Sequence, residues 1–222
     1  IGRADGLSHT EYLELGSLLG KKFQDKFVSA EKLYSDFKSR HTATEIAAFA
    51  EAGNYSYKIA ERALSNEVIT PGVTRLEEVA WWMLEQLHRS NLESSFGMPS
   101  VYVTGPDGIA ATSNDRIIQR GDILMIDWGV GYLSYYTDMK RMAYVLQEGE
   151  KDVPTGIKHA FIQALKARKV VTDAIKPGFT AQQNMDRIYS SLITNGFERM
   201  IEFNKPGASE KTDVMIGCHS VG

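Results

Sequence analysis

Several features that mark particular classes of protein are scarce in this 222-residue sequence. Cys218 is the only cysteine, so the chain cannot form an internal disulfide, which fits a reducing compartment. There is no run of about 18 apolar residues, the length that a membrane-spanning helix needs, so no membrane partner is predicted. The 25 lysines and arginines do not outnumber the 28 acidic residues, so nucleic acid is not an expected partner either. We therefore expect a cytoplasmic protein.

A ten-residue pattern occurs twice in the chain. Residues 68–77 read VITPGVTRLE, and residues 174–183 read AIKPGFTAQQ. In each copy Pro-Gly predicts the end of one helix, and a threonine with Glu or Gln three residues later predicts a capping box that starts the next. The pattern could be common helix–turn–helix punctuation, but the flanking helices repeat as well, which favours two similar α/β halves. These helices are expected at residues 45–66, 76–90, 156–176 and 182–195.

Two aspartates, Asp127 and Asp138, lie beside predicted strands. Residues 123–126 read ILMI, an apolar run typical of a buried strand, and residues 135–145 form a second strand-like stretch. A lone carboxylate directly after a buried strand is costly to ionise. An ordinary hairpin with a solvated acid at each end is the alternative interpretation.

The segment between these strands predicts how the two aspartates meet. Gly129 and Gly131 are typical of a bend, and a hairpin centred near residues 132–133 would make Asp127 and Asp138 cross-strand partners. Their Cβ atoms would then lie about 4.5–5.5 Å apart. Carboxylates so close repel each other unless a proton or a cation lies between them. Two divalent ions about 3.5–4 Å apart would suit this spacing.

These residues resemble a known family. The stretches GDILMIDWG at 121–129 and YYTDMKR at 135–141 are similar to the aspartate hairpin of the pita-bread metallopeptidases, and residues 103–110 and 115–122 are similar to the approach to it. Residues 29–46 resemble the start of the catalytic domain in the proline-directed members. The resemblance implies an α+β pita-bread fold, with two halves that are related by a pseudo-two-fold axis and carry antiparallel curved sheets, truncated here at the C-terminus.

The resemblance also implies a domain organisation. Residues 8–27 have a helix-like apolar period and are similar to the connector after an N-terminal domain in proline-directed members. We therefore expect residues 1–28 to be a connector helix from a missing N-terminal domain. Residues 29–222 would be the catalytic domain, incomplete at its C-terminal end.

The implied activity is that of a metal-dependent aminopeptidase or Xaa-Pro peptidase, similar to prolidase. Asp127 and Asp138 would help to hold two divalent ions (Mn, Co or Zn), and a hydroxide that bridges them would attack a peptide substrate. A homodimer is expected. The alternatives are a peptide-binding module without catalytic activity, and an enzyme that acts on a small molecule, as creatinase does.

His219 is the candidate catalytic histidine. In the sequence MIGCHSVG at 215–222 it is either the metal-binding histidine of the family or an earlier histidine that contacts the substrate carbonyl, and we favour the second role. A purely structural histidine is the third possibility. The other histidines lack a second ligand at helical spacing and are predicted to be solvated or to cap helices; they are His9, His41, His88 and His159.

Two departures from the family pattern bear on activity. The family has two glutamates after its histidine motif, and the sequence stops at Gly222, so this span alone is expected to be inactive. Peptidase members often carry a histidine shortly before the stretch at 115–118, whereas residues 108–114 contain none. The second departure favours the alternatives without peptidase activity.

Overall fold

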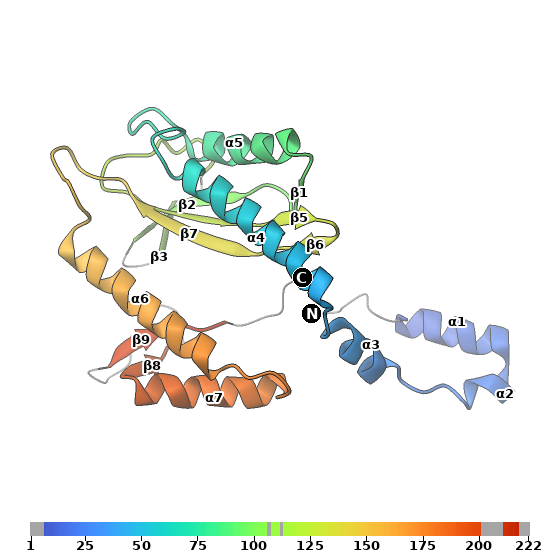
Figure 1. Cartoon of the computed structure of the whole chain (residues 1–222). Coiled ribbons are helices and arrows are strands. Elements are labelled where there is room, and N and C mark those ends of the chain that lie inside the picture. Colours follow the sequence, from blue (N-terminus) through green and yellow to red (C-terminus); the bar gives the residue numbers. More distant parts are fainter. Residues whose placement is uncertain (1–6, 106–107, 112, 201–210, 218–222) are drawn as a thin grey trace. The chain divides into compact units, whose positions relative to one another are not determined.

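The computed structural model describes residues 7–105, 108–111, 113–200 and 211–217, and the chain divides into two compact units, residues 1–46 and 47–222 (Figure 1). The first unit contains three helices: α1 (His9–Leu19), α2 (Lys21–Gln24) and α3 (Glu31–Lys38). The expected connector helix is thus broken, because Gly20 has a φ of 75° and separates α1 from α2. The domain boundary after residue 28 stays a prediction.

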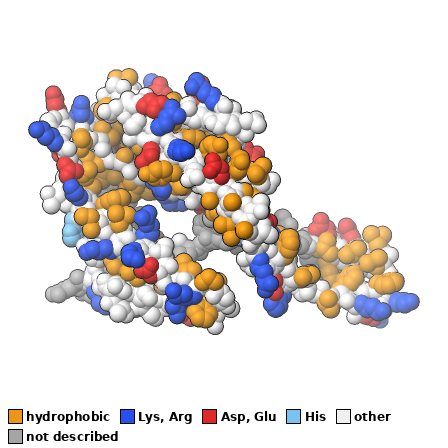
Figure 2. All heavy atoms as spheres, viewed as in Figure 1, with side chains coloured by type: hydrophobic (Ala, Val, Ile, Leu, Met, Phe, Trp, Pro, Cys, Tyr) orange, Lys and Arg blue, Asp and Glu red, His pale blue; other side chains and the backbone are white. Residues whose placement is uncertain are grey.

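The first unit buries few of its apolar side chains. Leu18 is 84% exposed, Leu33 75% and Phe37 76%. Figure 2 shows hydrophobic side chains on the surface of this unit. With so little apolar burial, tertiary packing within the unit contributes little to its stability.

The second unit begins within α4 (Ala43–Ala63) and contains two pairs of helices. Helix α4 is followed by α5 (Leu76–Arg89), and α6 (Thr155–Ala174) is followed by α7 (Ala181–Thr194). The four predicted helices are therefore confirmed, with ends that differ by at most three residues. Within the described part of the chain, no helix combines the length and the apolar composition that crossing a membrane requires.

An antiparallel sheet follows the first helix pair (Figure 1). Its order is β3 (Gly108–Ala111), β2 (Ser100–Gly105), β4 (Ile123–Trp128) and β7 (Met139–Tyr144). A smaller sheet contains β1 (Glu93–Ser94), β5 (Val130–Tyr132) and β6 (Tyr135–Tyr136). The predicted strand at 135–145 is therefore split into β6 and β7.

One face of the larger sheet is buried and the other is open. Side chains alternate between the faces of a strand, and Leu124, Ile126 and Trp128 of β4 are fully buried. They pack with Val79 and Met83 of α5 in one apolar core. The same core includes α4 side chains, so α4 and α5 together cover the buried face. Asp127 lies between two of these buried residues and therefore points to the open face.

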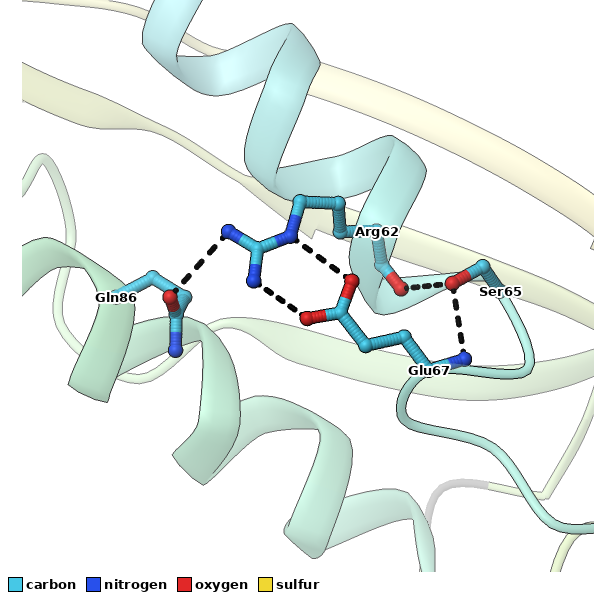
Figure 3. A network of polar contacts seen from close by, with 4 residues as sticks. All are labelled: Arg62, Ser65, Glu67 and Gln86. Carbon is cyan, nitrogen blue, oxygen red and sulfur yellow. Dashed lines mark hydrogen bonds and ion pairs between the residues drawn. The ribbon is translucent and has the colours of Figure 1, made fainter.

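A polar cluster joins the end of α4 to α5 (Figure 3). The Arg62 guanidinium donates two hydrogen bonds to the Glu67 carboxylate and one to Gln86 Oε1 of α5, and it lies 4.9 Å from the ring centre of Trp82. Ser65 Oγ donates to the carbonyl oxygen of Arg62 at 2.7 Å. This cluster fixes how the chain leaves α4.

The two repeated turns differ in detail. Thr180 caps α7 as predicted: its Oγ1 accepts from Gln183 N at 3.2 Å, and Gln183 Oε1 accepts from Thr180 N at 2.8 Å. The predicted capping box of Thr74 with Glu77 is wrong: the residue that caps α5 is Arg75, and Glu78 Oε2 accepts from Arg75 N at 2.7 Å. The Thr74 hydroxyl instead holds the turn together, accepting from Thr70 N at 2.9 Å.

The second half has a smaller core. Ala167, Ala174, Ile188, Leu192 and Phe197 form a cluster between α6, α7 and β8 (Phe197–Arg199). Strand β9 (Thr212–Val214) pairs with β8 in parallel, unlike the antiparallel pairs of the first half. A parallel pair cannot be joined by a tight hairpin, and about a dozen residues connect β8 to β9.

Candidate metal site

The register of the hairpin corrects the prediction for the two aspartates. In the β4–β7 pair, Asp127 lies opposite Lys140 and Trp128 lies opposite Met139. The turn consists of Leu133 and Ser134, which both have positive φ angles (52° and 65°), as a two-residue hairpin turn requires. The hairpin is thus centred one residue later than predicted. Asp127 and Asp138 are not direct cross-strand partners, so that prediction is wrong.

The two carboxylates nevertheless converge, because Lys140 lies between them. Asp138 precedes Lys140 by two residues, so it is a diagonal neighbour of Asp127, a relation in which the residues lie about 7–8 Å apart. Lys140 Nζ lies 3.1 Å from Asp127 Oδ1 and 3.4 Å from Asp138 Oδ1. The aspartate side chains are 27% and 25% exposed, and that of Lys140 is 52% exposed. One cation therefore bridges two partly buried acids.

Asp127 is incompletely satisfied in this arrangement. Lys140 Nζ forms an ion pair with Asp127 Oδ1, and this buried oxygen accepts no well-formed hydrogen bond within the described residues. Lys140 donates a hydrogen bond to Asp138 Oδ1 at 3.4 Å. An acceptor in this state has a free electron pair for a better-placed cation.

The charges at this face shift the pKa values of neighbouring groups. Burial alone would lower the pKa of the Lys140 ammonium, but Asp127 and then Asp138 outweigh this effect and raise it. Tyr102, on the neighbouring strand β2, has a raised pKa because of burial and because of the negative charge of Asp127; Lys140 opposes this shift. These shifts place Tyr102, Asp127 and Lys140 in one electrostatic neighbourhood on the open face of the sheet.

A buried chain of hydrogen bonds fixes the backbone directly before Asp138. Val130 N donates to Thr137 Oγ1 at 2.9 Å, and Thr137 Oγ1 lies 2.6 Å from Ser56 Oγ. Ser56 Oγ also donates to Ala52 O of α4 at 2.9 Å, and either hydroxyl can be the donor in the Ser56–Thr137 bond. Ser56 and Thr137 are 0% and 6% exposed. Helix α4 thereby anchors the residue next to Asp138.

Gly129 completes this anchor. A Cβ atom at this position would lie 1.7 Å from the carbonyl oxygen of Thr137 and 2.1 Å from Ser95 Oγ. That carbonyl accepts a hydrogen bond from Ser95 Oγ at 2.8 Å. The glycine is therefore required for close backbone approach rather than for the predicted bend.

The residues present fit a cation site in part. Two carboxylate oxygens converge on a position that a cation occupies here, and carboxylates suit divalent ions such as Mn and Zn. Within the described ranges no cluster of three or more His, Cys, Asp or Glu residues is placed to hold a metal. His219 lies outside the described residues. The other four histidines are exposed, as predicted, at positions 9, 41, 88 and 159.

Sequence reasoning missed three residues of this site: Lys140, Thr137 and Ser56. Lys140 could have been found from a hairpin with the correct register, which places it opposite Asp127. No local signal indicates Ser56, since it meets Thr137 across 81 positions of sequence.

Two hollows of the described surface lie away from the two aspartates. The larger, of about 470 Å³, lies between α5 and β2 and is lined by side chains that include Trp81, Met98 and Tyr102. Neither this hollow nor the one beside the β5–β6 turn has Asp127 or Asp138 in its wall. The convergence of charged groups therefore defines the candidate site.

Comparisons with family models and with curated proteins both point to peptidases. The family model described as "Metallopeptidase family M24" matches residues 47–222. An Xaa-Pro dipeptidase of Pyrococcus furiosus is 27% identical over 201 residues, which cover 84% of this chain and 54% of that protein. The chain spans about half the length of the curated relatives it matches.

Solved structures show the same fold. The prolidase of Pyrococcus horikoshii OT3 matches with a TM-score of 0.59 and 24% identity, over 86% of this chain and 52% of that one. A zinc-substituted aminopeptidase P of E. coli in complex with product matches with a TM-score of 0.64 and 16% identity, over 86% of this chain and 44% of that one. These likenesses confirm the predicted α+β pita-bread fold.

Proposed function

The chain belongs to metallopeptidase family M24, and from this premise we propose that it forms the site-bearing part of a metal-dependent peptidase with Xaa-Pro specificity. The premise supports the reaction class, and the Xaa-Pro dipeptidase of Pyrococcus furiosus supports the substrate class. Substrates would be peptides or dipeptides cleaved at the bond before proline. The protein would be cytoplasmic and would form a homodimer.

The convergence of Asp127 and Asp138 on one cation carries the proposal. Both oxygens lie within 3.4 Å of Lys140 Nζ, on the open face of a sheet whose other face is packed against α4 and α5. Carboxylates in such an arrangement are stabilised by positive charge. The rigid buried face keeps the carboxylates in place, which is the preorganisation that a metal site needs.

Two divalent ions at this face, of Mn, Co or Zn, would supply Lewis acidity and lower the pKa of water when bound. The residues of the chain would hold the ions and position the substrate. Asp127 and Asp138 would be ligands, and Thr137 would hold Asp138 in register through Ser56. His219 would donate to the oxyanion of the substrate, or alternatively serve as a further ligand; preorganised donors of this kind are worth about 3–4 kcal/mol.

Metal binding and hydrolysis test the proposal together. We expect Asp138→Asn to weaken Mn binding in isothermal titration calorimetry by at least about tenfold, because it removes a charged ligand. Hydrolysis of Xaa-Pro dipeptides by the protein in its longest natural form should fall in parallel. Asp173→Asn is the matched control, since Asp173 pairs with Lys169 on the exposed side of α6.

Two results would contradict the proposal. One is the absence of Mn, Co or Zn binding by the wild-type protein. The other is an Asp138→Asn variant that binds metal as tightly as the Asp173→Asn control does.

A peptide-binding module without catalytic activity is the second candidate, and the position of Lys140 favours it. Its ammonium already neutralises part of the charge that a metal would need. A protein that bound Xaa-Pro peptides without metal and without turnover would support this candidate. Equilibrium binding of a labelled peptide in the presence of a chelator separates the two functions.

A further inference from the structure

Lys140 makes an ion pair unlike those of Lys32, Lys158 and Lys169. Lys32, Lys158 and Lys169 each contact a single acid, and in each pair both side chains are more than half exposed. Lys140 contacts two acids, and their side chains are only 27% and 25% exposed. It is therefore the counter-ion of a partly buried pair of carboxylates rather than a partner in a solvated surface pair.

The backbone fixes the root of Lys140 at this place. The residue lies one pair from the hairpin end of the β4–β7 ladder, directly opposite Asp127, and strand alternation directs both side chains to the open face. Asp138 is held by the hydrogen bonds of Thr137, so neither acid can move away without disturbing the sheet. The long side chain of Lys140 is the flexible member of the three.

The ammonium and a metal ion cannot share the position between the two carboxylates. A divalent ion binds a carboxylate oxygen at about 2.0–2.2 Å, well inside the 3.1 and 3.4 Å distances of Lys140 Nζ. Two cations that compete for the same oxygens also repel each other at this range. Because the Lys140 side chain is 52% exposed, it can turn outward into water when an ion enters.

We propose that Lys140 is a built-in competitor for the metal: its ammonium occupies the cation position between Asp127 and Asp138, and a divalent ion binds there only by displacing it. This inference rests on the proposed metal site but goes beyond it, since it assigns to one residue control over metal affinity. The wild-type protein binds metal at this pair more weakly than the two aspartates alone would allow.

Substitution of Lys140 tests the inference through binding rather than through activity. In Mn titrations by isothermal calorimetry, Lys140→Met should bind at least about tenfold more tightly than the wild type, because it removes a unit charge roughly 3–4 Å from the ion. Lys140→Arg keeps the charge and should remain weak. Lys169→Met, which removes a lysine from a single exposed ion pair, should leave the affinity unchanged.

A second measurement guards against misfolding of the variant. Without metal, the melting temperature of Lys140→Met should lie below that of the wild type, because two carboxylates lose their shared cation. Added Mn should raise it by more than it raises that of the wild type, in line with tighter binding to the folded state. Lys140→Gln should behave in the same way, with a polar side chain in place of the apolar one.

The outcomes separate this inference from the proposed function. Equal Mn affinities of the wild type and Lys140→Met would overturn the role of Lys140 and leave the metal site standing. Absence of Mn binding in all variants, including Lys140→Met, would overturn both. Tighter binding that persists after Asp127→Asn is added to Lys140→Met would place the metal elsewhere and would also overturn the inference.

Discussion

The helix pair α4–α5 and the helix pair α6–α7 share the sequence Pro-Gly-x-Thr at their turns, starting at Pro71 and Pro177. The first turn is partly buried and bonded to the chain before β4: Gly72 N donates to Ile118 O at 2.7 Å, and Ile118 N donates to Thr74 O at 2.9 Å. The second turn is exposed around Thr180 and is closed by a local capping box. The same pattern thus performs two different structural tasks.

The apolar cores of the two halves also differ: among the described residues, the core of the first half is the larger. The first half packs two helices on a four-stranded sheet, whereas the second half has a small cluster between α6, α7 and β8. The candidate metal site lies in the half with the larger core. A repeated turn signature therefore indicates repeated topology, while the charged site depends on packing contacts of the first half.

The strongest test of this comparison substitutes a glycine in each half. Gly129→Ala should destabilise the protein by about 3 kcal/mol, at the upper end for overpacking, because its Cβ would lie 1.7 Å from the carbonyl oxygen of Thr137. Gly156→Ala in α6 meets no atom within 4 Å and should be neutral or slightly stabilising. Denaturant unfolding of both variants measures the difference. Comparable losses in the two would contradict the special packing of the first half.

The two turn threonines give a smaller effect that sharpens the comparison. Thr74→Val should cost about 2 kcal/mol, because it leaves the Thr70 N–H without its acceptor in a turn where Thr74 is 7% exposed. Thr180→Val removes an exposed helix cap and should cost about 1 kcal/mol. Thermal unfolding of the two variants side by side checks the order. If Thr180→Val proved the more damaging, the assignment of the two threonines would be reversed.

Much of the fold could be predicted from local sequence. Helical periodicity and Pro-Gly punctuation depend on neighbouring residues, so the four helices of the second unit were found with ends that differ by at most a few residues. The strands around Asp127 followed from the apolar run that precedes it. The break of the N-terminal helix at Gly20 was missed, since a glycine within a helical period is compatible with either outcome.

The hairpin register could not be predicted because its glycines have another purpose. Gly129 and Gly131 suggested the bend, yet they permit close contacts, with Thr137 for Gly129 and with Glu93 and Tyr136 for Gly131. The turn itself uses Leu133 and Ser134, residues that rarely adopt positive φ angles. Because the hairpin is centred one residue later than predicted, the residue opposite Asp127 is Lys140, two positions after Asp138. The roles of His219 and the domain boundary stay predictions.

The location of a metal ion in crystals soaked with Mn tests the central claim most directly. The account predicts an anomalous-scattering peak bonded to carboxylate oxygens of Asp127 and Asp138, with the Lys140 side chain turned away from its position 3.1 Å from Asp127 Oδ1. Crystals with Lys140 still between the two carboxylates, and with no peak beside them at a saturating Mn concentration, would contradict it.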